Sequence, residues 1–186
     1  GAVADVVGAA SAVLNGAFNI TASGTGNLTQ ANTLEAATNG GTIAIDALTD
    51  TVTAIAGSSD AVLNQVTGTV TATGTADISQ ASTIEAFAKA VSIAALTDTV
   101  TAIAGSNNNV LNQVTGAVTA TGTADVAQAT TIEAFAKAVS IAALTDTVAA
   151  IAGSNNNVLN QVTGAVTATG TADVAQATTI EAFAKA

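Results

Sequence analysis

Acidic residues recur at fixed positions along this chain and are the first candidates for chemistry. Rows of carboxylates can bind calcium, which takes oxygen ligands. However, the spacing of a calcium loop, with several Asp or Asn at alternate positions and a Gly, is absent. The pattern instead predicts helix caps, because a carboxylate is stabilised at the positive end of the helix dipole. The predicted caps are Asp50, Asp98 and Asp146 in the segment LTDT, and Asp77, Asp125 and Asp173 in the segment TAD.

The residue types that the chain lacks exclude most catalytic and metal chemistry. Without His or Cys, ordinary zinc, copper and haem sites cannot form. A Cys nucleophile and a His base to activate Ser or Thr are absent as well. Carboxylates alone could serve a glycosidase-like site, which needs two carboxyl groups with different pKa values. A regular repeat, however, gives each acid the same environment, so no two of them would differ in pKa. We therefore expect no enzyme, no catalytic residue and no cofactor, with calcium as the ion left open.

Charge and hydropathy narrow the range of partners. The chain has 3 basic residues against 13 acidic ones and a formal net charge of −10. Nucleic-acid binding depends on neutralising phosphates, so this balance argues against it. No run of about 18 apolar residues occurs, so we expect no membrane insertion.

Internal repeats dominate the sequence. Residues 91–138 and 139–186 are identical except that Ala149 replaces Thr101, which gives a period of 48 residues. Residues 43–90 follow the same pattern with modest differences, and residues 1–42 form a diverged, partial copy. This pattern predicts a single solenoid domain over residues 1–186.

The first half of each repeat predicts a strand and a helix. Residues 69–75 (TVTATGT) alternate in type, which places Val70 and Ala72 on one face and threonines on the other. A helix follows, with Thr75 or Asp77 as its N-cap. Its apolar stripe at helical spacing is Ile78, Ala81, Ile84 and Ala88.

The second half predicts a second strand and helix. Residues 91–95 read as a strand, and residues 96–99 begin a short helix with Thr97 or Asp98 as N-cap. Gly105, a residue able to take positive φ, ends that helix. A loop and another helical turn then point Val110, Leu111 and Val114 inward.

The order of these elements predicts the architecture. Each repeat holds two β-α coils of about 22–26 residues, long enough for parallel strands with helical crossovers. We expect a right-handed α/β solenoid with a parallel sheet on one side and short helices on the other. Coils this short cannot bury their own apolar faces, so neighbours must stack. The alternative is an all-β solenoid, which the threonine-rich composition also allows.

Two sets of uncharged polar residues recur in register. One set predicts ladders of side-chain amides that satisfy buried polar groups between coils: Asn64, Asn112, Asn160, Gln80, Gln128 and Gln176. The other predicts a regular row on the open sheet face: Thr71, Thr73, Thr119, Thr121, Thr167 and Thr169. This row could bind a surface such as ice or polysaccharide, dock a second sheet, or be a solvated face of β-forming residues.

The segments LTDTVTAIAG and TGAVTATGTADVAQATTIEAF resemble the Ala/Thr-rich tandem repeats of very large bacterial surface and extracellular proteins, common in cyanobacteria. The resemblance covers nearly the whole chain. It implies secretion, an extracellular or cell-surface location, and an adhesive, sheath or filament role. The Gly/Asp-rich nonapeptides that bind calcium in many such proteins are absent from this chain.

These observations favour a structural repeat segment that acts as a spacer or a filament- or sheath-forming element. Ala186 is in phase with Ala90 and Ala138, without an atypical capping sequence. An uncapped coil exposes apolar surface and an unpaired strand edge. We therefore expect self-association, end to end or sheet to sheet, or a longer native chain. The alternative function is a binding module that uses the threonine row.

Overall fold

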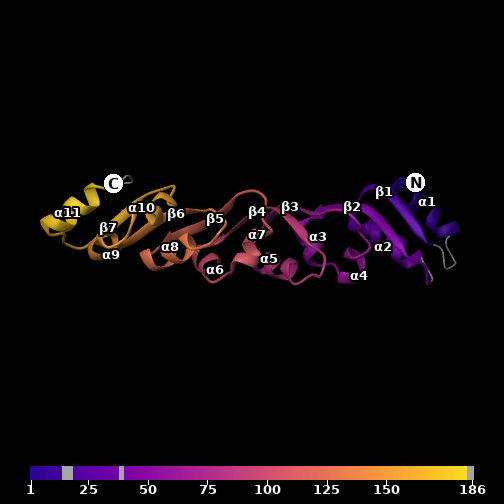
Figure 1. The fold of residues 1–186 in the computed structure, drawn as a ribbon, viewed down its shortest axis with the longest axis horizontal. Coiled ribbons are helices and arrows are strands. Elements are labelled where there is room, and N and C mark those ends of the chain that lie inside the picture. The colour runs from indigo at the N-terminus through magenta and orange to yellow at the C-terminus, as the bar shows by residue number, and fades with distance from the viewer. Residues whose placement is uncertain (14–18, 38–39, 184–186) are drawn as a thin grey trace. The chain divides into compact units, whose positions relative to one another are not determined.

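The computed structural model describes residues 1–13, 19–37 and 40–183, and it shows an α/β protein in which parallel strands alternate with helices. The chain forms two compact units, Gly1–Ala94 and Ala95–Ala186. Figure 1 labels the helices and strands of both units.

Unit 1 contains strands, the helices that flank them and the first residues of the strand β4 (Val91–Thr99). Gly1 and Ala2 pair with β1 ahead of the first helix. In chain order the elements are α1 (Val3–Val13), β1 (Ile20–Gly26), α2 (Leu28–Ala37), β2 (Ile43–Thr51), α3 (Val52–Ala56), α4 (Asp60–Leu63), β3 (Val70–Ala76) and α5 (Ile78–Glu85).

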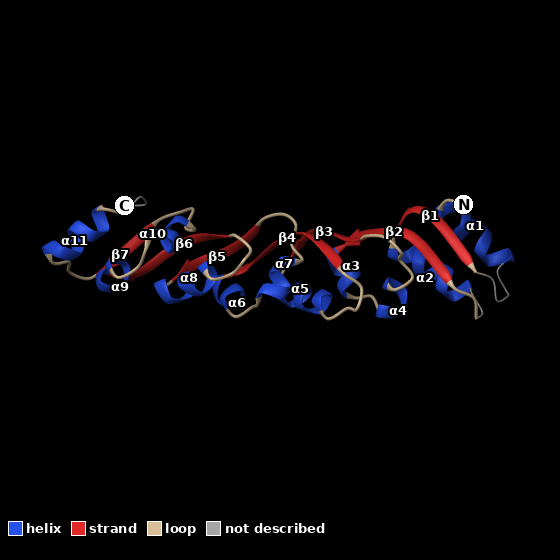
Figure 2. Cartoon of the chain, in the orientation of Figure 1, coloured by secondary structure: helices blue, strands red, loops and turns tan. Residues whose placement is uncertain are grey.

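In unit 2 a strand and two short helices come first, and the order of elements that unit 1 shows from β1 onward then repeats. Its first strand, β4 (Val91–Thr99), begins just before the boundary at Ala95. The remaining elements are α6 (Val100–Ala104), α7 (Asn108–Asn112), β5 (Val118–Ala124), α8 (Val126–Glu133), β6 (Val139–Thr147), α9 (Val148–Ala152), α10 (Asn156–Asn160), β7 (Val166–Thr169) and α11 (Val174–Glu181). Figure 2 shows α6 and α8 on one side of β5 and β6.

All described strand pairs are parallel, and their register repeats. In unit 2, Leu96 of β4 lies opposite Val118 of β5, and Leu144 of β6 lies opposite Val166 of β7. Between β5 and β6 the register shifts after Ala120, where Gly122 adopts a φ of +87°. This conformation favours glycine, so the sequence TATGT encodes a bulge within the strand.

The core of each unit is a layer of aliphatic side chains between strands and helices. In unit 2, Ile141, Leu144, Ile103 and Leu111 are 0% exposed. No polar or charged residue is buried among the described residues. Burial of one such side chain contributes about 1.5–3 kcal/mol. The apolar positions of successive strands therefore bind each coil to the next.

The first predicted strand and its helix are confirmed with small shifts. The strand is Val70–Ala76, with Val70 and Ala72 buried, and Asp77 is the N-cap of α5. Ala81 and Ile84 are buried as predicted. The helix ends at Glu85, so Ala88 lies outside it and is exposed.

The second predicted strand was too short. β4 continues through Thr99, so residues 96–99 belong to the strand and do not begin a helix. The extension is paired, because Leu96 to Thr99 lie opposite residues of β5. Gly105 ends α6 as expected, but its φ of −81° lies outside the left-handed region. Val110, Leu111 and Val114 are buried as predicted.

The expectation of an α/β fold with a parallel sheet is confirmed, and the all-β alternative is wrong. The segments after the strands form hydrogen-bonded helices with side-chain caps, such as α5 and α8. Ala, Gln and Ile in these segments are compatible with helix, and the Asp caps fix where each helix begins. Among the described residues, no helix is long and apolar enough to cross a membrane.

Candidate functional site

The aspartates of the TAD segments cap helices. Asp77, Asp125 and Asp173 are the N-caps of α5, α8 and α11. Each carboxylate accepts a hydrogen bond from the backbone N–H of the glutamine three residues later, at 2.7–2.8 Å. That glutamine side chain accepts from the N–H of the aspartate in return, which completes a capping box.

The aspartates of the LTDT segments do not cap the helix that follows them, which corrects the prediction. Thr51, Thr99 and Thr147 are the N-caps of α3, α6 and α9, and their hydroxyls accept from a backbone N–H at 3.2 Å. Asp50, Asp98 and Asp146 lie one residue earlier, inside the strands. The strands extend to these threonines because their last residues pair with the next strand.

Asp50 and Asp146 instead cap a helix of the preceding coil. The carboxylate of Asp146 accepts from the N–H of Val126, the first residue of α8, at 3.0 Å. It also accepts from the N–H of Thr147 at 2.7 Å. Asp50 makes the same pair of bonds to Leu28 of α2 and to Thr51. Asp98 accepts from the N–H of Thr99.

These bonds change the acidity of Asp146. The hydrogen bonds from Val126 and Thr147 hold the pKa of its carboxyl below the ordinary value, and burial opposes them only in part. The carboxylates thus bind backbone N–H groups of neighbouring coils. No group of three or more acidic side chains that could hold a metal ion occurs in the described part of the chain.

The structure does not show the predicted ladders of side-chain amides. Gln80 and Gln128 donate instead to the hydroxyls of Thr53 and Thr101, at 3.2 and 3.3 Å. Gln176 completes the capping box of α11. Asn64, Asn112 and Asn160 are exposed at the ends of α4, α7 and α10, so they satisfy no buried group. Within unit 2, β6 lies between the coils of Gln128 and Gln176, which places these two glutamines too far apart for a direct ladder.

The predicted threonine row lies on the open face of the strands and is wider than expected. Thr71 and Thr119 are half-buried, and Thr73, Thr121, Thr167 and Thr169 are exposed. Each of the six lies opposite another threonine on the preceding strand: Thr49, Thr51, Thr97, Thr99, Thr145 and Thr147. The hydroxyls of Thr73, Thr121 and Thr169 donate to backbone carbonyls of Asp50, Asp98 and Asp146. Because these three hydroxyls are already bonded to the backbone, half of the row presents methyl groups rather than free hydroxyls.

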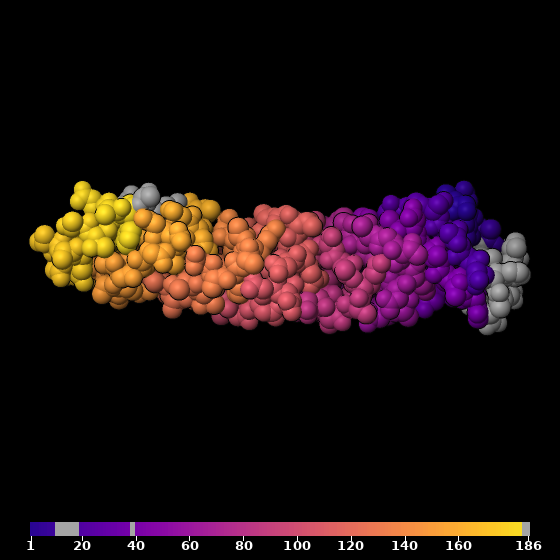
Figure 3. All heavy atoms as spheres, viewed as in Figure 1, coloured from indigo at the N-terminus to yellow at the C-terminus, as the bar shows by residue number. Residues whose placement is uncertain are grey.

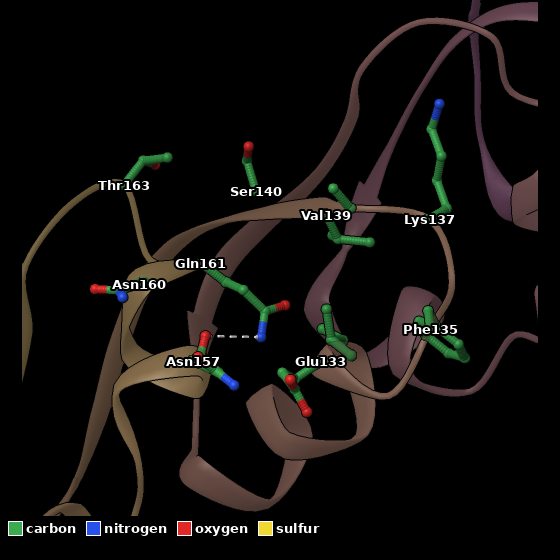
Figure 4. A pocket seen from close by; sticks show the side chains of 11 residues that line it. Glu133, Phe135, Lys137, Val139, Ser140, Asn157, Asn160, Gln161 and Thr163 are labelled. Carbon is green, nitrogen blue, oxygen red and sulfur yellow. Dashed lines mark hydrogen bonds between the residues drawn. The ribbon is translucent and has the colours of Figure 1, made fainter.

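A pocket of about 460 Å³ lies in unit 2 between the end of α8 and α10. Figure 4 shows Gln161, Asn157 and Glu133 converging, while Lys137 and Thr163 point elsewhere. The amide of Gln161 already donates to the backbone carbonyl of Asn157 at 3.4 Å. Since Lys137 and Thr163 point away and the Gln161 amide is already bonded, this pocket indicates no particular ligand.

The last coil of unit 2 carries the most unusual surface. The sequence VAQATTIE forms both α8 and α11, yet Ala129 and Ile132 of α8 are buried whereas α11 has no buried residue. Val174 at the start of α11 is 84% exposed. Figure 3 shows this last coil in yellow at one end of unit 2. We call the set Val166, Ala168, Val174, Ala177 and Ile180 the last-coil face.

The strand of this coil is also incomplete. The sequence VTATGTA forms seven residues of strand in β5 but only the first four of them in β7. In β5 the residues after the bulge, Thr123 and Ala124, pair with Ala143 and Leu144 of β6. Among the described residues of unit 2, β7 has β6 on one side and no strand on the other. Its outer edge thus presents unpaired backbone groups beside the exposed apolar side chains.

Sequence reasoning did not identify this surface as a set of residues. No family model matches the chain, and neither the curated proteins nor the solved structures include a detectable match. The last-coil face and the contacts between coils are therefore the features of the molecule that bear on its function.

Proposed function

We propose that this chain is a structural repeat segment that works by stacking its coils, as a spacer or as a filament- or sheath-forming element of a large extracellular or cell-surface protein. The repeats would form a right-handed α/β solenoid with a period of 48 residues. Such a role requires no catalytic group. The extracellular location is supported by the resemblance of the repeats to those of large bacterial surface proteins.

One observation carries this proposal: the same residues are buried inside unit 2 and exposed at its last coil. Val118 and Ala120 are 2% and 0% exposed, whereas their counterparts Val166 and Ala168 are half-exposed and exposed. An apolar surface next to an open strand edge favours addition of another coil. Burial of one valine or isoleucine contributes about 1.5–3 kcal/mol, so several together support association.

Sedimentation and electron microscopy of the chain over a concentration series test the proposal. We expect the mass to grow with concentration, and end-to-end contacts to give linear particles. Ala177→Asp should abolish this growth because its counterpart Ala129 is buried under the next coil. A chain that remains monomeric at the highest attainable concentration would contradict the proposal.

Ala175→Asp is the matched control. It introduces the same charge on the same helix, but its counterpart Ala127 is exposed even inside unit 2. This variant should associate like the unmodified chain. Equal loss of association in both variants would indicate a general effect of charge and would remove the support for the last-coil face.

The register of the threonines favours a second candidate function, binding of a regular surface such as ice or a polysaccharide. Thr97 lies opposite Thr119, and Thr99 lies opposite Thr121, so the row spans neighbouring strands. Thermal hysteresis and sedimentation with insoluble polysaccharide test this candidate. Thr119→Lys should abolish either activity if the row is the binding surface, whereas self-association at the last coil should persist.

A further inference from the structure

Two kinds of coil alternate along each unit. One kind has a strand of nine residues followed by two short helices, as in β6, α9 and α10, and we call it the two-helix coil. The other kind has a strand of seven residues followed by one longer helix, as in β5 and α8, and we call it the one-helix coil. Unit 1 shows the same alternation, because β2, α3 and α4 come between the one-helix coils β1–α2 and β3–α5.

A one-helix coil contacts the two-helix coil that follows it through a bulged strand. In unit 2, Ala120 of β5 lies opposite Ile141 of β6 before the register shifts. After the shift, Ala124 lies opposite Leu144. The register of β1 against β2 in unit 1 shifts in the same way and again reaches a leucine, Leu48. This contact therefore joins a strand that carries a bulge to a strand that is regular.

A two-helix coil contacts the one-helix coil that follows it in a different way, with no shift of register. In unit 2, Asp98 of β4 lies opposite Ala120 of β5. The hydroxyl of Thr121 donates to the backbone carbonyl of Asp98 at 3.0 Å. In unit 1, Asp50 and the strand β3 repeat both features. This contact therefore sets a small side chain beside the aspartate and adds a hydrogen bond from a threonine.

Two two-helix coils in succession would not fit this unshifted contact. Residues 139–142 would take the place of residues 118–121 beside β4. Ile141 would then lie opposite Asp98, where a bulky aliphatic side chain excludes water from the carboxylate. The methyl group of Ala142 would replace the hydroxyl that donates to the carbonyl of Asp98. Such a contact would lose a hydrogen bond and desolvate a charge.

Two one-helix coils in succession would not fit the bulged contact. Both strands would carry the bulge, so the pairing beyond it would slip by one residue. Ala124 would then lie opposite a threonine, Thr171, in the place of Leu144. Because side chains of a strand alternate between its two faces, such a slip sets inward side chains beside outward ones. The aliphatic layer would be interrupted at this contact.

We infer that each coil accepts only a coil of the other kind as its neighbour in the stack, so that the chain can gain or lose coils only in pairs. This inference rests on the proposed stacking function and names the coil that fits each stacking surface. One coil of each kind together makes up a repeat such as residues 91–138. The period of 48 residues thus follows from the two different contacts between coils.

Insertion of coils at natural junctions tests the inference. A copy of residues 91–138, inserted after Ala138, adds one coil of each kind and keeps the alternation. A copy of residues 91–117 after Ala117, or of residues 118–138 after Ala138, adds a single coil and creates one contact between like coils. All of these insertions keep the Ala-Val junctions that the chain has before its strands.

Hydrogen exchange of the whole chain, followed by mass at a dilution where each variant is monomeric, counts the amides that packed coils protect. Insertion of both coils should raise the number of slowly exchanging amides by about a quarter, in proportion to the added residues. Either single-coil insertion should add none, because the extra coil lacks a neighbour that fits. Added protection from a single coil, or none from the pair of coils, would overturn the inference.

A substituted form of the inserted copy of residues 91–117 tests the role of the side chains. In this copy alanine and threonine replace the counterparts of Ile93 and Ala94, which sets an alanine opposite Asp98 and restores the threonine hydroxyl. The substituted copy should gain protected amides. In the unmodified chain the same changes, Ile141→Ala with Ala142→Thr, should instead lower the melting temperature by about 5 °C or more, because Ile141 is buried. Failure of the substituted copy to gain protection would overturn the role given to the residue opposite Asp98.

The insertions and the association of whole chains can fail independently. If only the pair of coils gains protection but the chain never associates, the alternation of coils is right and the filament role is wrong. If the chain associates but a single coil is accommodated as well, the alternation is wrong and the stacking role stands.

Discussion

At the scale of single residues, hydrogen bonds of the aspartates hold one coil to the next. Asp125 caps its own helix through a local capping box, while Asp146 reaches back 20 residues to the first N–H of that same helix. Two carboxylates from different coils thus satisfy two of the N–H groups that a helix leaves unpaired at its start. These hydrogen bonds at the helix N-terminus therefore hold neighbouring coils together, in addition to the packing of the apolar core.

Replacing Asp146 by Asn should lower the melting temperature in a way that depends on pH. The pKa of the Asp146 carboxyl is lowered in the folded chain, so the stability that it contributes is fully present above the ordinary Asp pKa of about 3.9. That contribution is lost as the pH falls through the lowered pKa. Thermal melts should therefore show a difference near pH 7 that shrinks and vanishes in acid.

Glu181→Gln is the control, since it removes one negative charge at the exposed end of α11. Its melting temperature should stay close to that of the unmodified chain at every pH. A difference for Asp146→Asn that persisted unchanged into strong acid would show that the charge of the carboxylate is irrelevant to the cap.

The repeat contains a natural test of the bond between Gln128 and Thr101. Thr101 accepts from Gln128 at 3.3 Å, but the next copy has Ala149 in its place, so Gln176 cannot make this bond. A double-mutant cycle of Thr101→Ala and Gln128→Ala should give a coupling free energy of about 0.5 kcal/mol, low because the pair is exposed. Chemical unfolding measures it.

The matched cycle uses Ala149→Ser and Gln176→Ala in the last copy. Serine restores a hydroxyl, so a similar coupling should appear there only when position 149 carries one. Coupling near zero at both pairs would mean that these glutamines contribute to stability through their capping boxes alone.

At the scale of elements, the strand VTATGTA depends on its glycine. Gly122 adopts a φ of +87°, and the register of β5 against β6 shifts there. Gly122→Ala should lower the free energy of unfolding by about 1–2 kcal/mol, because alanine is strained in this region. Denaturant titration of the purified variant measures this loss.

Gly8→Ala provides a contrast with the same change of side chain. Gly8 lies inside α1, and a Cβ there would meet no atom within 4 Å. This substitution should raise the stability by about 0.5–1 kcal/mol, because alanine favours helix. Destabilisation by both substitutions would show that the bulge is not the reason for the glycine in the strand.

Strands and helices could be predicted from the sequence where the local residue pattern determines their bounds. They were predicted less well where pairing with a distant segment determines them. Alternation in residues 69–75 identified β3, and the spacing of Ala81 and Ile84 identified α5. The end of β4 was missed because Leu96 to Thr99 stay extended by pairing with β5, a contact about 22 residues away. The capping of Leu28 by Asp50 was missed for the same reason, because these two residues are 22 positions apart in the sequence.

At the scale of the whole molecule, identical sequence in two environments reveals what stacking contributes. The last coil repeats residues 125–138 without change, so its conformational preferences are the same. Yet its strand is shorter and its helix has no buried residue. The difference must come from the neighbouring coil, as expected for repeat proteins in which each unit contacts only those beside it. Sequence alone did not identify the residues that differ in exposure between these coils.

Hydrogen exchange can measure this contribution within a single molecule. The N–H of Ala129 bonds to the carbonyl of Asp125, and the N–H of Ala177 bonds to that of Asp173, both at 3.0 Å. Because the flanking sequences are identical, their intrinsic exchange rates are equal. In dilute chain we expect Ala177 to exchange at least about tenfold faster, since only Ala129 is covered. In concentrated chain, stacking should bring the two rates closer together. Equal rates at dilution would mean that the covering coil adds no stability, and the stacking role would lose its physical basis.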